Sequence, residues 1–390
     1  MNDQQRRQAA HLHYEHDLDK TEIAAALGVP RREVGVGIRE ARKRNLVRVE
    51  VQDLYGSAPR LDVELGERLA RRFRLSRAVV VKVDDDILAG EVLDSDTSAD
   101  LAAADRASDE IHHQLGRAAG EFLYQFVNGE HDSVAVGAGR GVHFTIRTLR
   151  EQVEEHAPRL GRLEIFSVVG AMWVRTHSLH ERAREYVDAD QNALELADIF
   201  EVPWSRVHLA WLPRLYLVGD VAEKAQVIAK VSPHLQGDDW KGCSARDEGS
   251  VTLSLFGCGV VNDRGHYMMR EWGPQTAAVE EIQHLRDVVL PADPTAVVDV
   301  CDRFWLRAEA DLPDDVRQEA QTIVDRLNDL SVAATLAKLN SAHRRCLVAG
   351  GASKLEAISE ILRHGTDIGL TPDILVTDSV TAGKLLAGSG

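Results

Sequence analysis

The sequence is poor in cysteine and has no long hydrophobic run. Its four cysteines stand far apart and none belongs to a C-x-x-C pair, which argues against a disulfide framework and against a zinc site. No stretch approaches the length of about 18 uninterrupted apolar residues that would predict a membrane span. Residues 1–17 lack the apolar middle of a signal peptide. We therefore expect a cytoplasmic protein that does not bind membranes.

Charge is distributed unevenly along the chain, whose formal net charge is −16. Residues 1–60 hold 11 Arg and Lys against 9 Asp and Glu, a balance of +2, so the rest of the chain carries −18. Only the N-terminal part therefore has a charge balance that is compatible with binding a polyanion such as DNA. This asymmetry fits a small DNA-binding unit on an acidic body.

A length of 390 residues, 44% of them apolar, exceeds one ordinary domain and supplies ample core material. The alternating run "LVRVEV" over residues 46–51 predicts a strand that ends the first unit. We place a DNA-binding domain at residues 1–55 and a larger domain at residues 56–390.

The N-terminal unit predicts two short helices separated by a glycine turn. A preceding helix is expected over residues 5–16. Thr21 is a plausible N-cap for the next helix, and Gly28 suits its end. Pro30 opens the following helix, whose apolar positions recur at helical spacing: Val34, Ile38 and Ala41. This pattern is typical of a helix-turn-helix. A small helical hairpin without a DNA-binding role is the alternative.

The second helix of this motif is basic on its outer face. Arg31 and Arg32 lie at its leading end, the part of a recognition helix that meets base edges. Glu33 would repel phosphate unless it accepts from a cytosine amine. Gly35 and Gly37 each weaken a helix interior by roughly 1 kcal/mol relative to Ala. A solvated basic face is the alternative to DNA contact. The candidate DNA contacts are Arg31, Arg32, Arg39, Arg42 and Lys43.

The large unit alternates short apolar runs with helical patterns, which predicts an α/β fold with a doubly wound parallel sheet. A helix is expected from Leu61 to Phe73, and the acidic segment 84–110 is expected to be a surface loop or a loose helix. In such a sheet, ligands bind outside the carboxyl ends of the strands. Strands are expected within residues 78–83, 133–137, 163–170, 251–259, 345–351 and 373–378.

Two strand exits carry the residues of a candidate anion site. Gly137, Gly139 and Gly141 let backbone N–H groups turn toward an oxyanion, and Arg140 would add a guanidinium. Helix N-terminal amides from Thr145 onward are expected to add to the positive electrostatic field at this site. A tight strand-to-helix corner is the alternative. The second exit is a Gly-Gly pair followed by Lys354. Arg175, at a further exit, is a candidate second contact.

The chain resembles the SorC/DeoR-like family of sugar-binding transcriptional regulators over nearly its whole length. Residues 22–51 are similar to that family's "EIAxxLGISRPTVSRLLxEAR" and "GIVxIxI", although its Ser-Arg pair is replaced here by Gly35 and Val36. Residues 134–141 match the loop "igVGwGrT". Residues 348–386 look like "AgGpxKxxAIxaaLxxgxxnxLiTDxxxAxxLL", and residues 295–305 resemble "GAVGDxCGRFF" without its three glycines.

The resemblance implies an isomerase-like (NagB/RpiA/CoA-transferase-like) α/β domain that binds a phosphorylated sugar, in a homodimer or homotetramer. It adds Asp299 as an acceptor from sugar hydroxyls, with helix capping or a core-edge role as the alternative. Asn192 is carried over from one matching position and equally suits a helix cap. The effector-binding candidates are Gly137, Gly139, Arg140, Gly141, Arg175, Asp299 and Lys354.

Taken together, these patterns predict a transcriptional regulator whose affinity for double-stranded operator DNA is controlled by a phosphorylated sugar or related metabolite. No nucleophile–base arrangement, metal site or cofactor is expected, although Asp299, His143 and the pair Asp263–His266 could serve acid–base chemistry. The alternative is a sugar-phosphate enzyme, or a DNA-independent sensor that keeps a degenerate helix-turn-helix.

Overall fold

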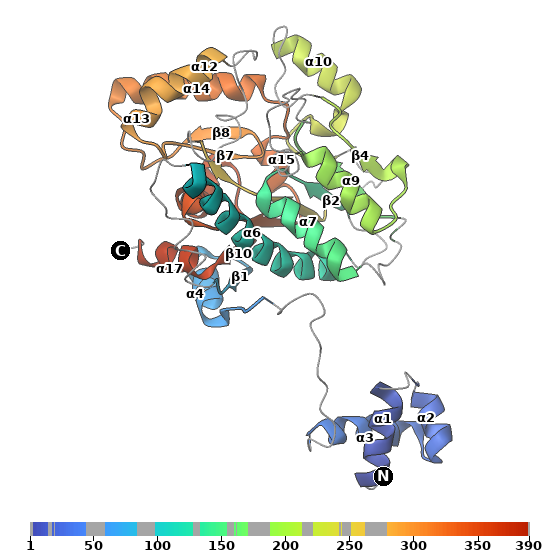
Figure 1. Ribbon diagram of the computed structural model, residues 1–390. Coiled ribbons are helices and arrows are strands. Elements are labelled where there is room, and N and C mark those ends of the chain that lie inside the picture. The colour runs from blue at the N-terminus through green and yellow to red at the C-terminus, as the bar shows by residue number, and fades with distance from the viewer. Residues whose placement is uncertain are drawn as a thin grey trace. The chain divides into compact units, whose positions relative to one another are not determined.

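The computed structural model divides into two compact units, Met1–Ser57 and Ala58–Gly390 (Figure 1). Within them the structure describes residues 3–14, 18, 20–43, 59–83, 98–127, 133–153, 160, 162–170, 188–212, 221–241, 243, 251–261 and 279–388. The strand predicted over residues 46–51 lies outside these ranges. None of the described helices has the length and apolar character that crossing a membrane requires.

The N-terminal unit contains helices α1 (Asp3–Tyr14), α2 (Lys20–Leu27) and α3 (Arg31–Lys43). Gly28 has a φ of +63° and ends α2, as predicted. Because α2 begins at Lys20, Thr21 lies in its first turn and the prediction of Thr21 as N-cap is wrong. The three helices share one small core, to which α3 contributes two of the apolar positions that the spacing predicted; its buried members are Ala9, Ile23, Val34 and Ile38.

The large unit is built on a seven-stranded parallel sheet in the order β1-β10-β9-β5-β2-β3-β4. This confirms the predicted α/β class, and each expected strand lies within its predicted range or one residue outside it. The strands are β1 (Arg77–Val81), β2 (Ser133–Val136), β3 (Glu164–Ser167), β4 (Val207–His208), β5 (Leu253–Phe256), β9 (Arg344–Val348) and β10 (Ile374–Asp378).

Helices pack on both faces of this sheet (Figure 1). One face is covered by α4 (Val63–Phe73), α16 (Leu355–Ile368) and α17 (Ser379–Ala387). The other is covered by α6 (Ser98–Phe126), α7 (Arg140–Val153) and α9 (Ala189–Ile199). Residues 98–110, the second half of the acidic segment 84–110, thus belong to a long helix that continues into the buried positions Ile111 and Leu115, while residues 84–97 lie outside the described ranges.

A second, three-stranded antiparallel sheet was not predicted. It contains β6 (Gly259–Val260), β7 (Val297–Val300) and β8 (Arg303–Leu306), and it packs with α12 (Val279–His284) and α14 (Asp314–Leu330) around a separate core. The remaining described helices are α10 (Val221–Val231), α13 (Leu290–Ala292) and α15 (Leu336–Asn340), with a π-helical turn at Leu285–Val289 and 3₁₀ turns at Trp204–Arg206, Pro233–Leu235 and Ala352–Lys354.

Candidate functional site

The strand order of the large sheet reverses between β2 and β5. From β2 the chain continues to β3 and β4 on one side, whereas from β5 it continues to β9 and β10 on the other. At such a reversal the connecting helices leave on opposite faces, which opens a crevice at the carboxyl ends of the two strands. The glycine loop 137–141 follows β2, and the Gly350–Gly351 exit follows β9, which adjoins β5.

The glycines of the first loop meet the strand ends around them. A Cβ on Gly141 would lie 2.3 Å from the carbonyl oxygen of Val348, and one on Gly137 would lie 2.7 Å from the Sγ of Cys301. Gly139 has a φ of +105° and open space beside it. The loop is therefore a close-packed corner at Gly137 and Gly141, whereas Gly139 is needed for its positive φ. The amide of Gly137 donates to the carbonyl of Leu255 at 2.8 Å, so the prediction that this amide turns toward an anion is wrong.

The helix after this loop begins five residues earlier than predicted. α7 starts at Arg140, and the amide of His143 already donates to the carbonyl of Gly139 at 3.0 Å. The amides without intrahelical acceptors are thus those of the first turn, from Arg140 to Val142, and not those from Thr145 onward. The Thr145 hydroxyl instead donates to the carbonyl of Gly141. The glycine loop therefore supplies the amide end of a helix directly.

Asn192 holds the loop from the side. It is buried within α9, and its Nδ2 donates to the carbonyl of Gly137 at 3.0 Å. The N-cap of α9 is Asp188, so the alternative that Asn192 caps a helix is wrong. Among the described residues the Oδ1 of Asn192 has no hydrogen-bond partner. Asn192 thus positions the glycine loop.

Lys354 is placed by a histidine that the sequence did not single out. Its Nζ lies 2.8 Å from the Nε2 of His112, whose Nδ1 lies 2.6 Å from the carbonyl of Ser108. Burial lowers the pKa of His112 well below its ordinary value, and the charges of Lys354 and Arg140 lower it further. Neutral His112 therefore donates from Nδ1 to Ser108 and accepts from the Lys354 ammonium at Nε2.

The Arg140 side chain lies against α6. Its Nη1 donates to the hydroxyl of Ser108 at 3.0 Å and lies 3.7 Å from a carboxylate oxygen of Asp109. Lys354 contacts the ring of His112 directly, and Arg140 contacts Ser108, which the same ring also contacts, so the two cations lie near one buried, neutral histidine. An anion in this region would meet both positive charges.

The Gly-Gly exit is fixed by Asp378 of the "TD" motif. The buried carboxylate accepts from the amide of Gly351 at 2.7 Å and from the Thr381 hydroxyl at 2.6 Å. It also caps α17 by accepting from the amides of Val380 and Thr381. A Cβ on Gly350 would lie 2.6 Å from the same carboxylate. One aspartate thus orients both the loop that carries Lys354 and the neighbouring helix.

Asp299 lies in β7, opposite Gly259 of β6. It is buried, and it accepts from the amide of Asp302 at 3.4 Å within the hairpin. Burial raises the pKa of the adjacent Cys258 thiol to about 12, with Lys354 and Asp299 acting on it in opposite directions. β6, which pairs with β7 at Asp299, also contacts the 3₁₀ turn Ala352–Lys354, so Asp299 and Lys354 lie in the same region of the large unit.

Several predicted residues lie outside the described part of the chain. These are Arg175, together with Asp263 and His266 of the acid–base alternative. His143 is described, and it is buried in α7 beside Phe144. Within the described ranges, no group of three His, Cys, Asp or Glu side chains could hold a metal ion.

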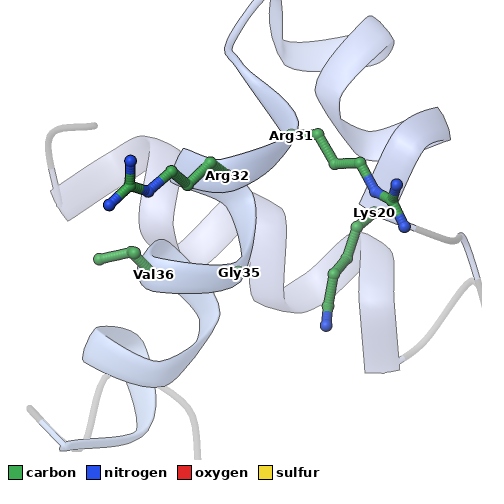
Figure 2. A pocket seen from close by; sticks show the side chains of 5 residues that line it. All are labelled: Lys20, Arg31, Arg32, Gly35 and Val36. Carbon is green, nitrogen blue, oxygen red and sulfur yellow. The ribbon is translucent and has the colours of Figure 1, made fainter.

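The candidate DNA-binding surface lies on the N-terminal unit. Arg31 and Arg32 are exposed at the start of α3, and with Lys20, Gly35 and Val36 they line a surface hollow (Figure 2). Lys20 was not among the predicted contacts, because it comes from α2 and only the packing of the two helices brings it there. Three further candidates belong to α3 with side chains outside the described part: Arg39, Arg42 and Lys43.

Comparison with known proteins supports the same architecture. No family model matches the chain. A deoxyribonucleoside regulator from Bacillus subtilis (strain 168) is 23% identical over 381 residues, which cover 97% of this chain and 96% of that protein. The full-length sorbitol operon regulator SorC from Klebsiella pneumoniae is 18% identical, with a TM-score of 0.53 over 98% of this chain and 99% of its own.

A third similar protein is a transcriptional regulator from Streptococcus pneumoniae TIGR4. It is 13% identical, with a TM-score of 0.54, and the match covers 84% of this chain and 97% of that one. These likenesses confirm, at the level of the fold, the resemblance that the motifs predicted. The chain has the fold of the SorC/DeoR-type sugar-binding transcriptional regulators.

Proposed function

We propose that this chain is a transcriptional regulator that binds operator DNA with its N-terminal unit and a phosphorylated sugar, or a related anionic metabolite, with its large unit. The observation that carries the proposal is the convergence of the glycine loop and the Lys354 exit at the strand-order reversal. Ligands of open α/β sheets bind at this point. The similar proteins are named as regulators, which supports the same assignment.

The charges of the crevice favour an anionic ligand. The α7 amides from Arg140 to Val142 and the ammonium of Lys354 both favour negative charge. His112 stays neutral, so it orients Lys354 without neutralising it. Asp299, an acceptor on the strand that pairs with β6 beside the Lys354 turn, would select ligands that carry hydroxyl groups. A sugar phosphate combines the two properties.

The N-terminal unit supplies the charges for DNA. Arg31 and Arg32 at the leading end of α3, with Lys20 beside them, form a cationic surface on a helix-turn-helix. Such side chains bind phosphates and read guanine edges. Arg39, Arg42 and Lys43 would extend the contact along the same helix. A homodimer or homotetramer would present two such helices to paired half-sites.

Regulation requires that the effector bind two arrangements of the protein with different affinity. We propose that effector binding shifts the oligomer between arrangements with different half-site spacing. The residues that would sense the ligand are Gly139, Arg140, Gly141 and Lys354 of the two strand exits, Asp299 of β7, and Arg175 at a further exit. Gly137 would only shape the loop, because its amide donates to the carbonyl of Leu255.

The first test is binding of the purified protein to fragments of its own upstream region, at two salt concentrations, with and without a panel of sugar phosphates. We expect sequence-selective binding that weakens steeply with salt and that one sugar phosphate alters. Replacing both Arg31 and Arg32 with Gln should reduce affinity and flatten the salt dependence. Salt-labile, unselective binding would contradict the DNA-binding half of the proposal.

The effector site is tested separately with Lys354→Gln. We expect the effective concentration of the sugar phosphate to rise by about tenfold or more, since a charged hydrogen bond contributes about 1.5–3 kcal/mol. Lys384→Gln, an exposed lysine of α17, is the matched control and should leave it unchanged. Turnover of a sugar phosphate by the wild type would instead favour the enzyme alternative.

A further inference from the structure

The exposed face of the recognition helix contains an apolar residue that the fold does not use. In α3 the side chains of Val34 and Ile38 are buried in the core of the unit, whereas Val36 is 44% exposed. An isolated exposed valine needs no explanation on an ordinary surface. Here it lies one turn after Arg32, on the part of the helix that would enter the major groove.

Val36 borders the hollow that the two helices form. In Figure 2 the side chains of Arg32 and Val36 extend to one side of α3, while Lys20 and Arg31 lie on the other side of the hollow. A Cβ on Gly35 would lie 3.9 Å from the Cδ of Lys20, so the lysine stem runs beside bare backbone. The lining thus combines three cations with one apolar group and contains no carboxylate.

This combination matches one edge of a base pair and its backbone. Arg and Lys side chains bind phosphate oxygens, and the only apolar group that B-DNA presents in the major groove is the C5-methyl of thymine. The isopropyl group of Val36 can neither donate nor accept a hydrogen bond. On a DNA-contacting helix, such a side chain would select by methyl contact alone and would distinguish thymine from cytosine.

We infer that Val36 contacts the C5-methyl of one thymine in each half-site and is a specificity-determining residue of this regulator. Lys20 binds the neighbouring phosphate and fixes the register of the helix without reading sequence. The inference rests on the proposed DNA-binding function, and it adds the base that one side chain reads.

The test replaces each thymine of the operator, one at a time, with deoxyuridine, which lacks only the C5-methyl. The full-length protein is used, and its operator is first identified by the selective binding described above. We expect one position in each half-site where the replacement weakens binding about fourfold, the effect of one buried methyl-sized group. The Val36→Ala protein should bind the thymine operator about as weakly as the wild type binds the deoxyuridine operator. Its affinity should not change when deoxyuridine is placed at that position.

Two variants control for indirect effects. Val221→Ala removes the same atoms from a valine that is 48% exposed in the large unit, and it should bind every operator as the wild type does. Lys20→Gln should weaken binding uniformly, lower the salt dependence by about one phosphate contact, and keep the response to deoxyuridine. Circular dichroism checks that each variant is folded.

The outcomes separate the two levels of the proposal. Selective binding with no deoxyuridine-sensitive thymine, or a Val36→Ala protein that keeps the wild-type sensitivity, overturns the role of Val36 and leaves the regulator in place. Absence of any selective binding by the wild type overturns both.

Discussion

Three histidines of the large unit are held in environments that disfavour their charged form. Burial lowers the pKa of His112 and of His208, and it lowers that of His234 to about 4. The His234 ring lies 6.1 Å from that of His208, and positive charge on His208 or Lys338 would further oppose its protonation. In its neutral form the Nε2 of His234 donates to the carbonyl of Ser167 at 2.9 Å.

His234 should make the stability of the large unit depend on pH. The unfolded chain takes up this proton at a pKa near 6.5, and the folded chain at about 4. The unfolded state therefore binds more protons between these values, so the free energy of unfolding falls as the pH drops from 6.5 to 4. The pKa difference corresponds to roughly 3 kcal/mol.

Urea unfolding at pH 7, 5.5 and 4.5 checks this. His234→Phe should be less stable at pH 7, because the Ser167 carbonyl loses its donor, but it should lose less stability on acidification. Parallel pH profiles for variant and wild type would contradict the assignment.

Gly141 should not tolerate a side chain. Its Cβ would meet a backbone carbonyl at 2.3 Å, and a strand end cannot move away as a flexible side chain would. We expect Gly141→Ala to lower the free energy of unfolding by about 2–3 kcal/mol. The matched control is Gly383→Ala in α17, where nothing lies within 4 Å. It should instead stabilise the protein by up to about 1 kcal/mol. Equal effects of the two changes would argue against close packing at Gly141.

At the scale of elements, the carboxylate of Asp378 joins the β9 exit to the start of α17. Asp378→Ala removes a helix cap and also leaves the amide of Gly351 and the hydroxyl of Thr381 without this acceptor. We expect a loss of about 2–4 kcal/mol and weaker sugar-phosphate binding, because Lys354 loses its fixed approach. Chemical unfolding and a ligand titration measure the two effects.

Asp62→Ala provides the comparison for Asp378. Asp62 caps α4 through the amide of Leu65 at 3.0 Å and makes no contact with either strand exit. The Asp62→Ala substitution should lower the free energy of unfolding by only about 1 kcal/mol and leave ligand affinity unchanged. If both aspartate variants affect the ligand equally, the effect follows global stability and not the position of Lys354.

The hairpin between β7 and β8 shows why one element was missed. Its two turn residues, Cys301 and Asp302, have φ values of +50° and +59°. Two-residue hairpin turns in which both residues have positive φ usually contain glycine or asparagine. The sequence shows neither at these positions, so local preference did not indicate a turn. Contacts around Asp302, which is fully buried, hold the backbone there instead.

At the scale of the whole molecule, the two units have separate cores. Among the described residues, the hydrophobic cluster of the N-terminal unit is small, with Ala9, Ile23, Val34 and Ile38 as its buried members, whereas three large clusters support the other unit. Stability in so small a unit is marginal. Loss of one large side chain from the small core should therefore unfold that unit alone.

Ile23→Ala tests this independence. We expect it to cost about 2–4 kcal/mol, enough to abolish the proposed DNA binding while the proposed sugar-phosphate binding by the large unit persists. Ala26→Ser, an exposed change in the same helix, should keep both activities. Loss of ligand binding in Ile23→Ala would show that the two units are not independent.

The sequence by itself determined the elements that depend on local pattern. The spacing of Val34, Ile38 and Ala41 predicted α3, and the continuous apolar runs predicted the parallel strands, because period and burial are written along the chain. The motifs also marked both strand exits of the crevice.

Only the tertiary structure decided which side chains meet at these strand exits. His112, Asn192 and Asp378 are brought to the loops by packing between distant segments, and Lys20 reaches Arg31 only when α2 docks on α3. Contacts between residues far apart in sequence depend on how the helices and strands pack together. A local sequence pattern predicts the elements but is not sufficient to predict this packing.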